Sequence, residues 1–145
     1  MEKINAFGIC LYKKEKNTIK VLLCKSVKSK DRWGFLKGVA LKNESKEETA
    51  LREFEEECSI SVHKKDLEDF FIQKNELKNI GLFTVNADSI SHISKYFEGE
   101  VLYKKYLSSE NSAVQFFDID QLPLIKKKQQ VVMKEIISFL KTCKK

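Results

Sequence analysis

Three glutamates, Glu53, Glu56 and Glu57, carry the strongest chemical signal in this sequence of 145 residues. Their spacing of i, i+3 and i+4 places them on one face of a helix, because each residue turns a helix by about 100°. Like charges at these spacings repel one another and weaken an isolated helix. The cluster becomes favourable when a hard cation such as Mg²⁺ binds among its oxygens. The spacing therefore indicates a metal site, with a solvated acidic surface as the alternative.

The residues around this cluster predict a packed helix over residues 46–58. Leu51, Phe54 and Cys58 recur at i, i+3 and i+7 and form an apolar stripe. Ser45 and Glu48 match the capping-box pattern at the helix start. A helix packed through such a stripe holds its acidic face in a fixed direction, which favours the metal site over the solvated surface.

Arg52 is one of only two arginines in a chain with 25 lysines. Its planar guanidinium can bind a carboxylate through two parallel hydrogen bonds, which a lysine cannot do. Glu44, in the preceding loop, is the expected partner. We expect this pair to brace the loop against the helix, and Glu44 could also reach a metal ion through water.

Residues 38–60, GVALKNESKEETALREFEEECSI, resemble the Nudix box. The matching positions are Gly38, Glu44, Arg52, Glu53, Phe54, Glu56, Glu57 and Ile60. Ser59 replaces the glycine that closes the motif, at a position where a left-handed backbone ends the helix, and it is expected to cost about 1 kcal/mol. Asn43 replaces a frequent glycine, and Leu36 a common proline. These changes concern loop geometry, because every carboxylate of the motif is present.

The resemblance implies a mixed α/β fold, an α/β/α sandwich with a mixed central sheet, in which the box forms a loop–helix–loop. Residues 5–12 and 18–24 flank a polar segment and predict a hairpin. Further strand-like segments are residues 59–62, 70–73, 81–86, 101–107 and 114–119, and helices are expected over residues 89–97 and 126–142. The length predicts that residues 1–145 form a single domain.

By resemblance, Glu53, Glu56 and Glu57 would bind Mg²⁺ or Mn²⁺, with the backbone carbonyl of Gly38 as a further contact. Either Glu53 or Glu57 would also help to deprotonate the water that attacks phosphorus.

Glu110 is the candidate for an additional metal ligand or general base. It lies six residues before Phe116, in a segment similar to the late part of Nudix sequences. Glu98 and Glu100 are competitors for this role. An ordinary loop glutamate is the alternative.

Residues 33–38, WGFLKG, resemble the segment that precedes the box in dinucleoside polyphosphate hydrolases, including diadenosine tetraphosphate hydrolase, and in some diphosphoinositol and RNA 5′-pyrophosphate hydrolases. Lys37 would hold a distal phosphate as a mobile charge. Trp33, Phe35 and Tyr106 are candidates for stacking on a base, and core packing is at least as plausible for them.

The resemblance thus predicts a metal-dependent pyrophosphohydrolase that cleaves a nucleoside diphosphate linked to another moiety. A dinucleoside polyphosphate is the preferred substrate. RNA 5′-pyrophosphate, nucleoside triphosphate and nucleotide-sugar hydrolysis are alternatives. Because fold does not determine function, a catalytically inactive nucleotide-binding regulatory module is kept as an alternative of another class.

Composition adds few constraints. A hydrophobic fraction of 42% and a single proline argue against disorder. No apolar run reaches the length of a membrane span, the N-terminus does not match a signal peptide, and the four cysteines lack metal-ligand spacing. We expect a cytoplasmic protein with reduced thiols, as a monomer or homodimer. The net charge of +6 comes from scattered lysines, which indicates solubility, with attraction to polyphosphate or an RNA 5′ end as the alternative.

Overall fold

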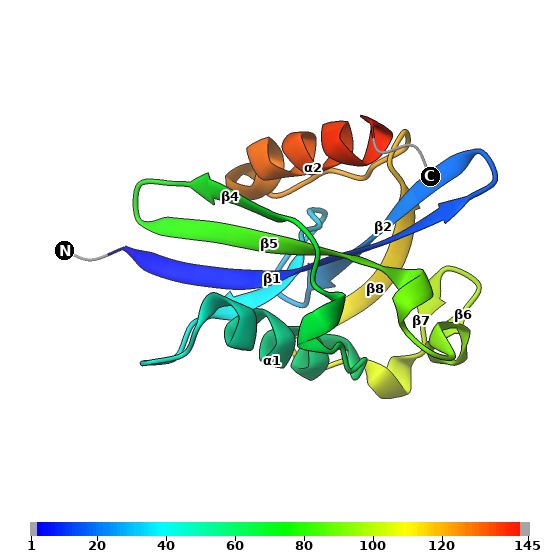
Figure 1. Ribbon diagram of the computed structural model, residues 1–145, viewed down its shortest axis with the longest axis horizontal. Helices are drawn as coiled ribbons and strands as arrows, with labels where there is room; N and C mark the ends of the chain where they lie inside the picture. Colours follow the sequence, from blue (N-terminus) through cyan, green and yellow to red (C-terminus); the bar gives the residue numbers. More distant parts are fainter. Residues whose placement is uncertain (1–2, 143–145) are drawn as a thin grey trace.

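The computed structural model describes residues 3–142, which form one mixed sheet between two helices (Figure 1). The strands are β1 (Ile4–Glu15), β2 (Thr18–Ser26), β3 (Leu36–Val39), β4 (Phe70–Lys74), β5 (Lys78–Asn86), β6 (Phe97–Glu98), β7 (Val101–Leu102) and β8 (Asn111–Asp118). The helices are α1 (Lys46–Cys58) and α2 (Gln130–Thr142). The strand order is β4-β5-β1-β2-β8-β7-β6, and β3 also pairs with β1.

The sheet is mixed because β1 and β5 run parallel, whereas β1 pairs antiparallel with β2 and β3. In Figure 1, α1 and α2 cover opposite faces of this sheet. The expected α/β/α sandwich with a mixed central sheet is therefore confirmed.

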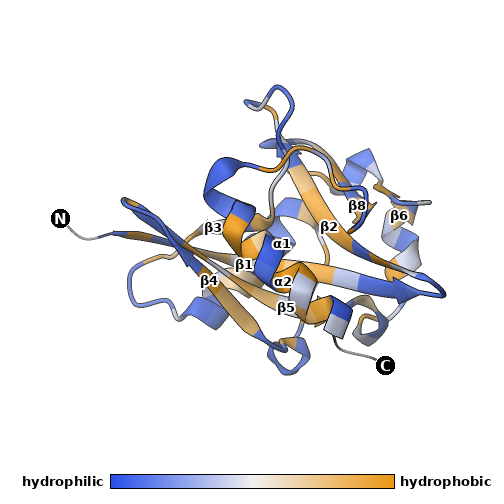
Figure 2. Cartoon of the chain, turned by 90° about the horizontal axis from the view of Figure 1, so that it is seen from above, coloured by the Kyte–Doolittle hydropathy of each residue, from blue (hydrophilic) through white to orange (hydrophobic). Residues whose placement is uncertain are grey.

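Successive residues of β1 serve two separate cores. Ile9 and Leu11 pack on the α1 side, whereas Cys10 and Tyr12 pack on the α2 side. This alternation follows from the two-residue period of a strand. The central strands are coloured mainly as hydrophobic in Figure 2, in keeping with burial on both faces.

The ends of α1 follow the local sequence signals. Ser45 Oγ accepts a hydrogen bond from the Glu48 amide at 3.0 Å, and the Ser45 amide donates to Glu48 Oε1 at 2.9 Å, which completes the expected capping box. At the other end Ser59 has a φ of 68° and its amide donates to the Glu55 carbonyl at 2.8 Å. Asn43 also has a positive φ, of 67°. Both departures from glycine thus lie at left-handed positions.

Several predicted elements are wrong. Residues 59–62 form no strand, because they have no neighbouring strand to pair with. Ile60 and Val62 are apolar because they pack into the α1-side core. Only two residues of the segment 101–107 are a strand, followed by a 3₁₀ turn at Lys104–Tyr106. The helix expected over 89–97 is replaced by 3₁₀ turns at Ala87–Ser89 and Ile93–Tyr96.

Two further differences affect the site. Residues 36–39, for which the sequence predicted no strand, form β3, which pairs with β1 from Ala6 to Ile9. The terminal helix begins at Gln130, after a 3₁₀ turn at Lys127–Gln129.

The described cysteines, Cys10, Cys24 and Cys58, are free and buried, as expected, whereas Cys143 lies outside the described residues. Within residues 3–142, no helix has the length and apolarity needed to cross a membrane.

Candidate active site

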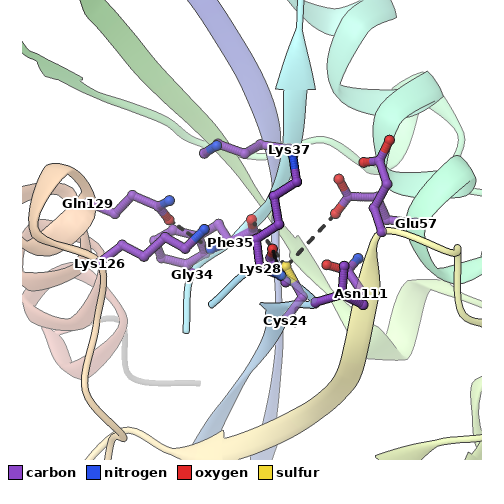
Figure 3. A pocket seen from close by; sticks show the side chains of 12 residues that line it. Cys24, Lys28, Gly34, Phe35, Lys37, Glu57, Asn111, Lys126 and Gln129 are labelled. Carbon is purple, nitrogen blue, oxygen red and sulfur yellow. Dashed lines mark hydrogen bonds between the residues drawn. The ribbon is translucent and has the colours of Figure 1, made fainter. Parts of the chain in front are cut away.

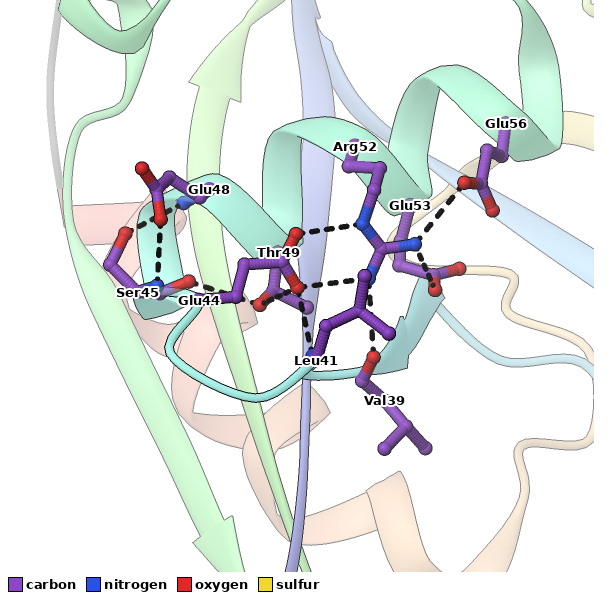
Figure 4. Close-up of polar contacts among 9 residues, drawn as sticks. All are labelled: Val39, Leu41, Glu44, Ser45, Glu48, Thr49, Arg52, Glu53 and Glu56. Atoms are coloured by element: carbon purple, nitrogen blue, oxygen red, sulfur yellow. Dashed lines mark hydrogen bonds and ion pairs between the residues drawn. The ribbon is translucent and has the colours of Figure 1, made fainter.

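The expected pair of Arg52 and Glu44 joins α1 to the loop before it (Figure 4). Arg52 Nε donates to Glu44 Oε2 at 2.7 Å, and Nη2 donates to Oε1 at 2.9 Å, which is the bidentate geometry. Glu44 Oε1 also accepts from Thr49 Oγ1 and from the Leu41 amide. These contacts, first among them the guanidinium, lower the pKa of Glu44 to about 2.

The same guanidinium reaches the acidic cluster. Arg52 Nη1 donates to Glu53 Oε2 at 2.9 Å and to Glu56 Oε2 at 3.1 Å (Figure 4). Glu53 lies against the backbone of Gly38, where an added Cβ would overlap its carboxyl group. An alanine at residue 38 would therefore displace the end of the Glu53 side chain.

Glu57 is the box carboxylate that lines a cavity of about 390 Å³ (Figure 3). Only 8% of the residue is exposed, and this burial raises the pKa of its carboxyl group to about 7. The Asn111 amide, which faces the carboxylate, and the charge of Lys37 oppose the rise, whereas the charges of Glu53 and Glu110 add to it. Glu57 thus has the environment of a group that exchanges protons near neutral pH.

Lys37 and Glu110 line the same cavity as Glu57. Burial is the main cause that lowers the pKa of Lys37, to about 8, and the charge of Lys126 contributes to the decrease. The Glu110 carbonyl accepts a hydrogen bond from the Val27 amide at 2.9 Å, which ties the loop before β8 to the end of β2. Fold topology therefore brings three separately predicted residues to one place.

The two competitors of Glu110 do not line this cavity. Glu100 lies near the other end of β1 and β2, where Lys13 Nζ is 2.7 Å from its Oε1 and Lys20 binds its Oε2. Glu98 is exposed on β6.

The aromatic candidates are placed elsewhere. Phe35 is only 2% exposed and packs in the α2-side core, so its ring has no exposed face on which a base could stack. Trp33 packs edge-on against Phe117, with ring centroids 4.8 Å apart, and does not line the cavity. Tyr106 packs against Tyr96 near the end of α1, with centroids 5.0 Å apart. Phe35 is thus a core residue, whereas Trp33 and Tyr106 are partly buried rings that pack against other aromatic residues.

Sequence reasoning did not assign the remaining polar residues of the cavity to the site, and these are Ser26, Lys28, Asn111, Lys126 and Gln129. The Phe35 amide donates to Gln129 Oε1 at 2.8 Å, although 94 positions separate the two residues. The backbone of Trp33 exchanges hydrogen bonds with Leu124 and Lys126, which holds the segment before α2 beside the cavity. Local sequence patterns carry no signal for such long-range contacts.

The donor set suits a divalent metal ion. Mg²⁺ prefers carboxylate and carbonyl oxygens as ligands. Such oxygens belong to Glu53, Glu56, Glu57, Glu110 and the Gly38 backbone. Among residues 3–142, no three acidic, histidine or cysteine side chains converge closely enough to form a ready metal cluster. The carboxylates of Glu53 and Glu56 are instead paired with Arg52. Glu57 is buried and forms no ion pair with any described residue, so a cation would offset the cost of its charge.

Comparison with solved structures shows the same fold in proteins of low sequence identity. Ap4A hydrolase of C. elegans, in a binary complex, matches with a TM-score of 0.63 and 17% identity over 97% of this chain and 99% of that one. The NUDIX domain of Shewanella oneidensis NrtR, complexed with ADP ribose, matches with a TM-score of 0.63 and 15% identity over 96% and 90%.

A MutT/nudix family protein from Enterococcus faecalis matches with a TM-score of 0.61 and 18% identity over 81% of this chain, which spans only 44% of that protein. No curated protein matches the chain. The family model described as NUDIX domain matches residues 2–138. This match covers most of the sequence, and the chain therefore belongs to the Nudix family, the hydrolases of phosphorus-containing acid anhydrides.

Proposed function

We propose that the chain hydrolyses a nucleoside diphosphate linked to another moiety, with a divalent metal ion, and that a dinucleoside polyphosphate such as diadenosine tetraphosphate is its preferred substrate. One observation carries this proposal. Glu57 from the box helix, Glu110 from the loop before β8 and Lys37 from β3 all line a single cavity. A carboxylate pair beside a cationic side chain suits a metal-bound polyphosphate.

Glu53, Glu56 and Glu57 would hold Mg²⁺ or Mn²⁺, with Glu110 and the Gly38 carbonyl as further ligands. When bound, the ion would neutralise the charge of the phosphate oxygens and lower the pKa of a bound water. Glu57 accepts the proton of the attacking water in this proposal, with Glu53 and Glu110 as the other candidates for that role.

Three residues act beside the reacting atoms. Lys37 binds a distal phosphate as a point charge. Arg52 and Glu44 hold the box helix and its loop in place, because their bidentate pair joins the two segments.

The regulatory alternative has one observation in its favour. The NrtR domain shares this fold and was solved with ADP ribose. A regulatory module predicts metal-dependent binding of a nucleotide without turnover. The complete set of box carboxylates in this chain supports hydrolysis instead.

The test is product release from a substrate panel, with and without Mg²⁺ or Mn²⁺. The panel contains diadenosine polyphosphates, nucleoside triphosphates, a nucleotide sugar, ADP-ribose and 5′-triphosphorylated RNA. We expect metal-dependent formation of ATP and AMP from diadenosine tetraphosphate. Glu57→Gln is expected to lower kcat at least about 100-fold, in the range typical of a lost general base.

Glu55→Gln is the matched control, because Glu55 lies on the exposed side of the same helix. It should leave turnover unchanged. Full turnover by Glu57→Gln would refute the assignment of Glu57, and tight binding of a nucleotide without any turnover would favour the regulatory module. Metal-independent, steeply salt-dependent RNA affinity would instead favour an RNA-binding role for the lysines.

A further inference from the structure

The cavity beside Glu57 has an acidic side and a basic side. Figure 3 shows Glu57 and Asn111 on one side, with Lys126 and Gln129 opposite them. Lys28, Lys37 and Lys126 all contribute to the lining. Among residues 3–142, the structure gives none of these three lysines an ion pair. Their positive charge is therefore available to an anionic ligand.

Asn111 supplies an independent sign of a ligand. The residue is only 8% exposed, and its buried Nδ2 faces the Glu57 carboxylate without reaching hydrogen-bond geometry with any described residue. A buried donor left unpaired costs roughly 1–3 kcal/mol, and most such groups in native proteins have partners. Because Asn111 lines the cavity, an acceptor oxygen of a bound molecule can satisfy this donor.

The cavity offers no ring on which a base can stack. Phe35 is the one aromatic residue in its lining among the described residues, and it is only 2% exposed. Lysine amines and amide donors, by contrast, are groups that bind phosphate oxygens. The lining therefore suits a phosphate chain better than a nucleobase.

We propose that the cavity selects its substrate by the number of linked phosphates rather than by the base. The three lysines bind phosphoryl groups other than the one attacked, and the Asn111 amide, on the carboxylate side, donates to an oxygen of the same phosphate chain. This inference rests on the proposed function, because it assigns the attacked phosphorus to the carboxylate side. Compounds with at least three linked phosphates are then preferred over diphosphates.

The first test is calorimetric binding of inorganic tripolyphosphate and pyrophosphate to the whole protein in EDTA, which requires no turnover. We expect tripolyphosphate to bind at least about tenfold more tightly. Lys126→Met should remove most of that preference. Lys127→Met is the matched control, since Lys127 is exposed and lies outside the cavity, and it should keep the preference.

Asn111→Leu extends the test to the amide, because leucine has a similar size and no donor. It should weaken tripolyphosphate binding while Lys127→Met does not. Equal affinity of the wild-type protein for both anions would overturn the inference. An equal loss in Lys126→Met and Lys127→Met would overturn it too, since that result would reflect the net charge alone.

A second test uses hydrolysis with Mg²⁺. Diadenosine compounds with two to five phosphates are compared with diguanosine compounds of the same lengths. We expect kcat/KM to change more with chain length than with the base, and the reverse order would contradict the inference. Absence of any hydrolysis with a retained preference for tripolyphosphate would refute the proposed function and still support the phosphate-selecting cavity.

Discussion

The backbone of Gly38 lies directly against the carboxylate of Glu53, with no room between them for a Cβ atom. Pairing with Phe7 of β1 holds residue 38 in the sheet, and α1 carries Glu53. The sheet and the box helix therefore meet at a carboxylate that is proposed to bind metal. The room left by glycine at residue 38 therefore determines where that carboxylate can lie.

The substitution Gly38→Ala should displace the Glu53 side chain and lower metal-dependent turnover at least about tenfold. Its cost in unfolding free energy should be only about 1 kcal/mol, because the overlapped atoms belong to the end of a side chain that can rotate. Turnover as a function of Mg²⁺ concentration, together with urea unfolding, measures both effects.

Gly99→Ala is the control for this experiment. Gly99 has a φ of 61° and no atom within 4 Å of an added Cβ, so alanine is strained there without a steric contact. It should lower the unfolding free energy by about 1 kcal/mol and leave turnover intact. If Gly38→Ala also kept full turnover, the contact with Glu53 would have no role in the site.

Arg52→Lys should destabilise the fold by about 2 kcal/mol, because a lysine cannot reproduce the two bonds to Glu44 and also reach Glu53. Arg32→Lys is a matched control at the only other arginine, whose Nη1 donates to the Ile125 carbonyl at 2.8 Å. That change should cost less than about 1 kcal/mol. Chemical denaturation of both variants decides the matter, and equal losses would contradict the bracing role.

Glu57→Gln should make the metal-free protein more stable at pH 8. Burial raises the pKa of this carboxyl group to about 7 in the folded protein, above its ordinary value of 4.5. The favourable contribution of the protonated form is therefore complete below pH 4.5 and is lost as the pH rises through 7. A glutamine avoids this loss, with an expected gain of about 2 kcal/mol at pH 8 and none at pH 4.5.

Urea unfolding in EDTA at the two pH values measures this gain. Glu55→Gln on the exposed side of the helix should show no such pH dependence. A Glu57→Gln variant no more stable than the wild type at pH 8 would show that the buried charge carries little cost.

Ser59→Gly should stabilise the protein by about 1 kcal/mol and raise Tm by roughly 3–5 °C. The left-handed backbone at the end of α1, with a φ of 68°, strains a serine and suits a glycine. The bond from Ser59 Oγ to the Tyr106 carbonyl is lost, but it lies at the surface. Ser61→Gly, at an exposed residue without a positive φ, should instead lower Tm slightly. Calorimetry of the two variants separates backbone strain from the loss of a serine.

Local signals were sufficient to predict the box helix and its brace. Ser45, Glu48 and the Arg52–Glu44 pair lie within eight positions of one another, and each behaves as its residue type requires. The strand β3 was missed because four residues that include Gly38 carry little strand propensity, and pairing with β1 determines their conformation.

The basic side of the cavity could not be predicted in the same way. Gln129 reaches Phe35 across 94 positions, and the backbone of Trp33 positions Lys126. Aromatic residue types also do not reveal whether a ring faces a ligand or a core, and the burial of Phe35 illustrates this ambiguity.

The hydrogen bond between Phe35 and Gln129 can form only after residue 129 has been synthesised. A nascent chain that has reached residue 123 already contains every box carboxylate, but it lacks Lys126 and Gln129 as well as the Leu124 carbonyl that accepts from Trp33. The residues of the capped, ion-paired box helix are thus synthesised before the cavity lining is complete. The side of the cavity that holds Lys126 and Gln129 is therefore added after the box helix.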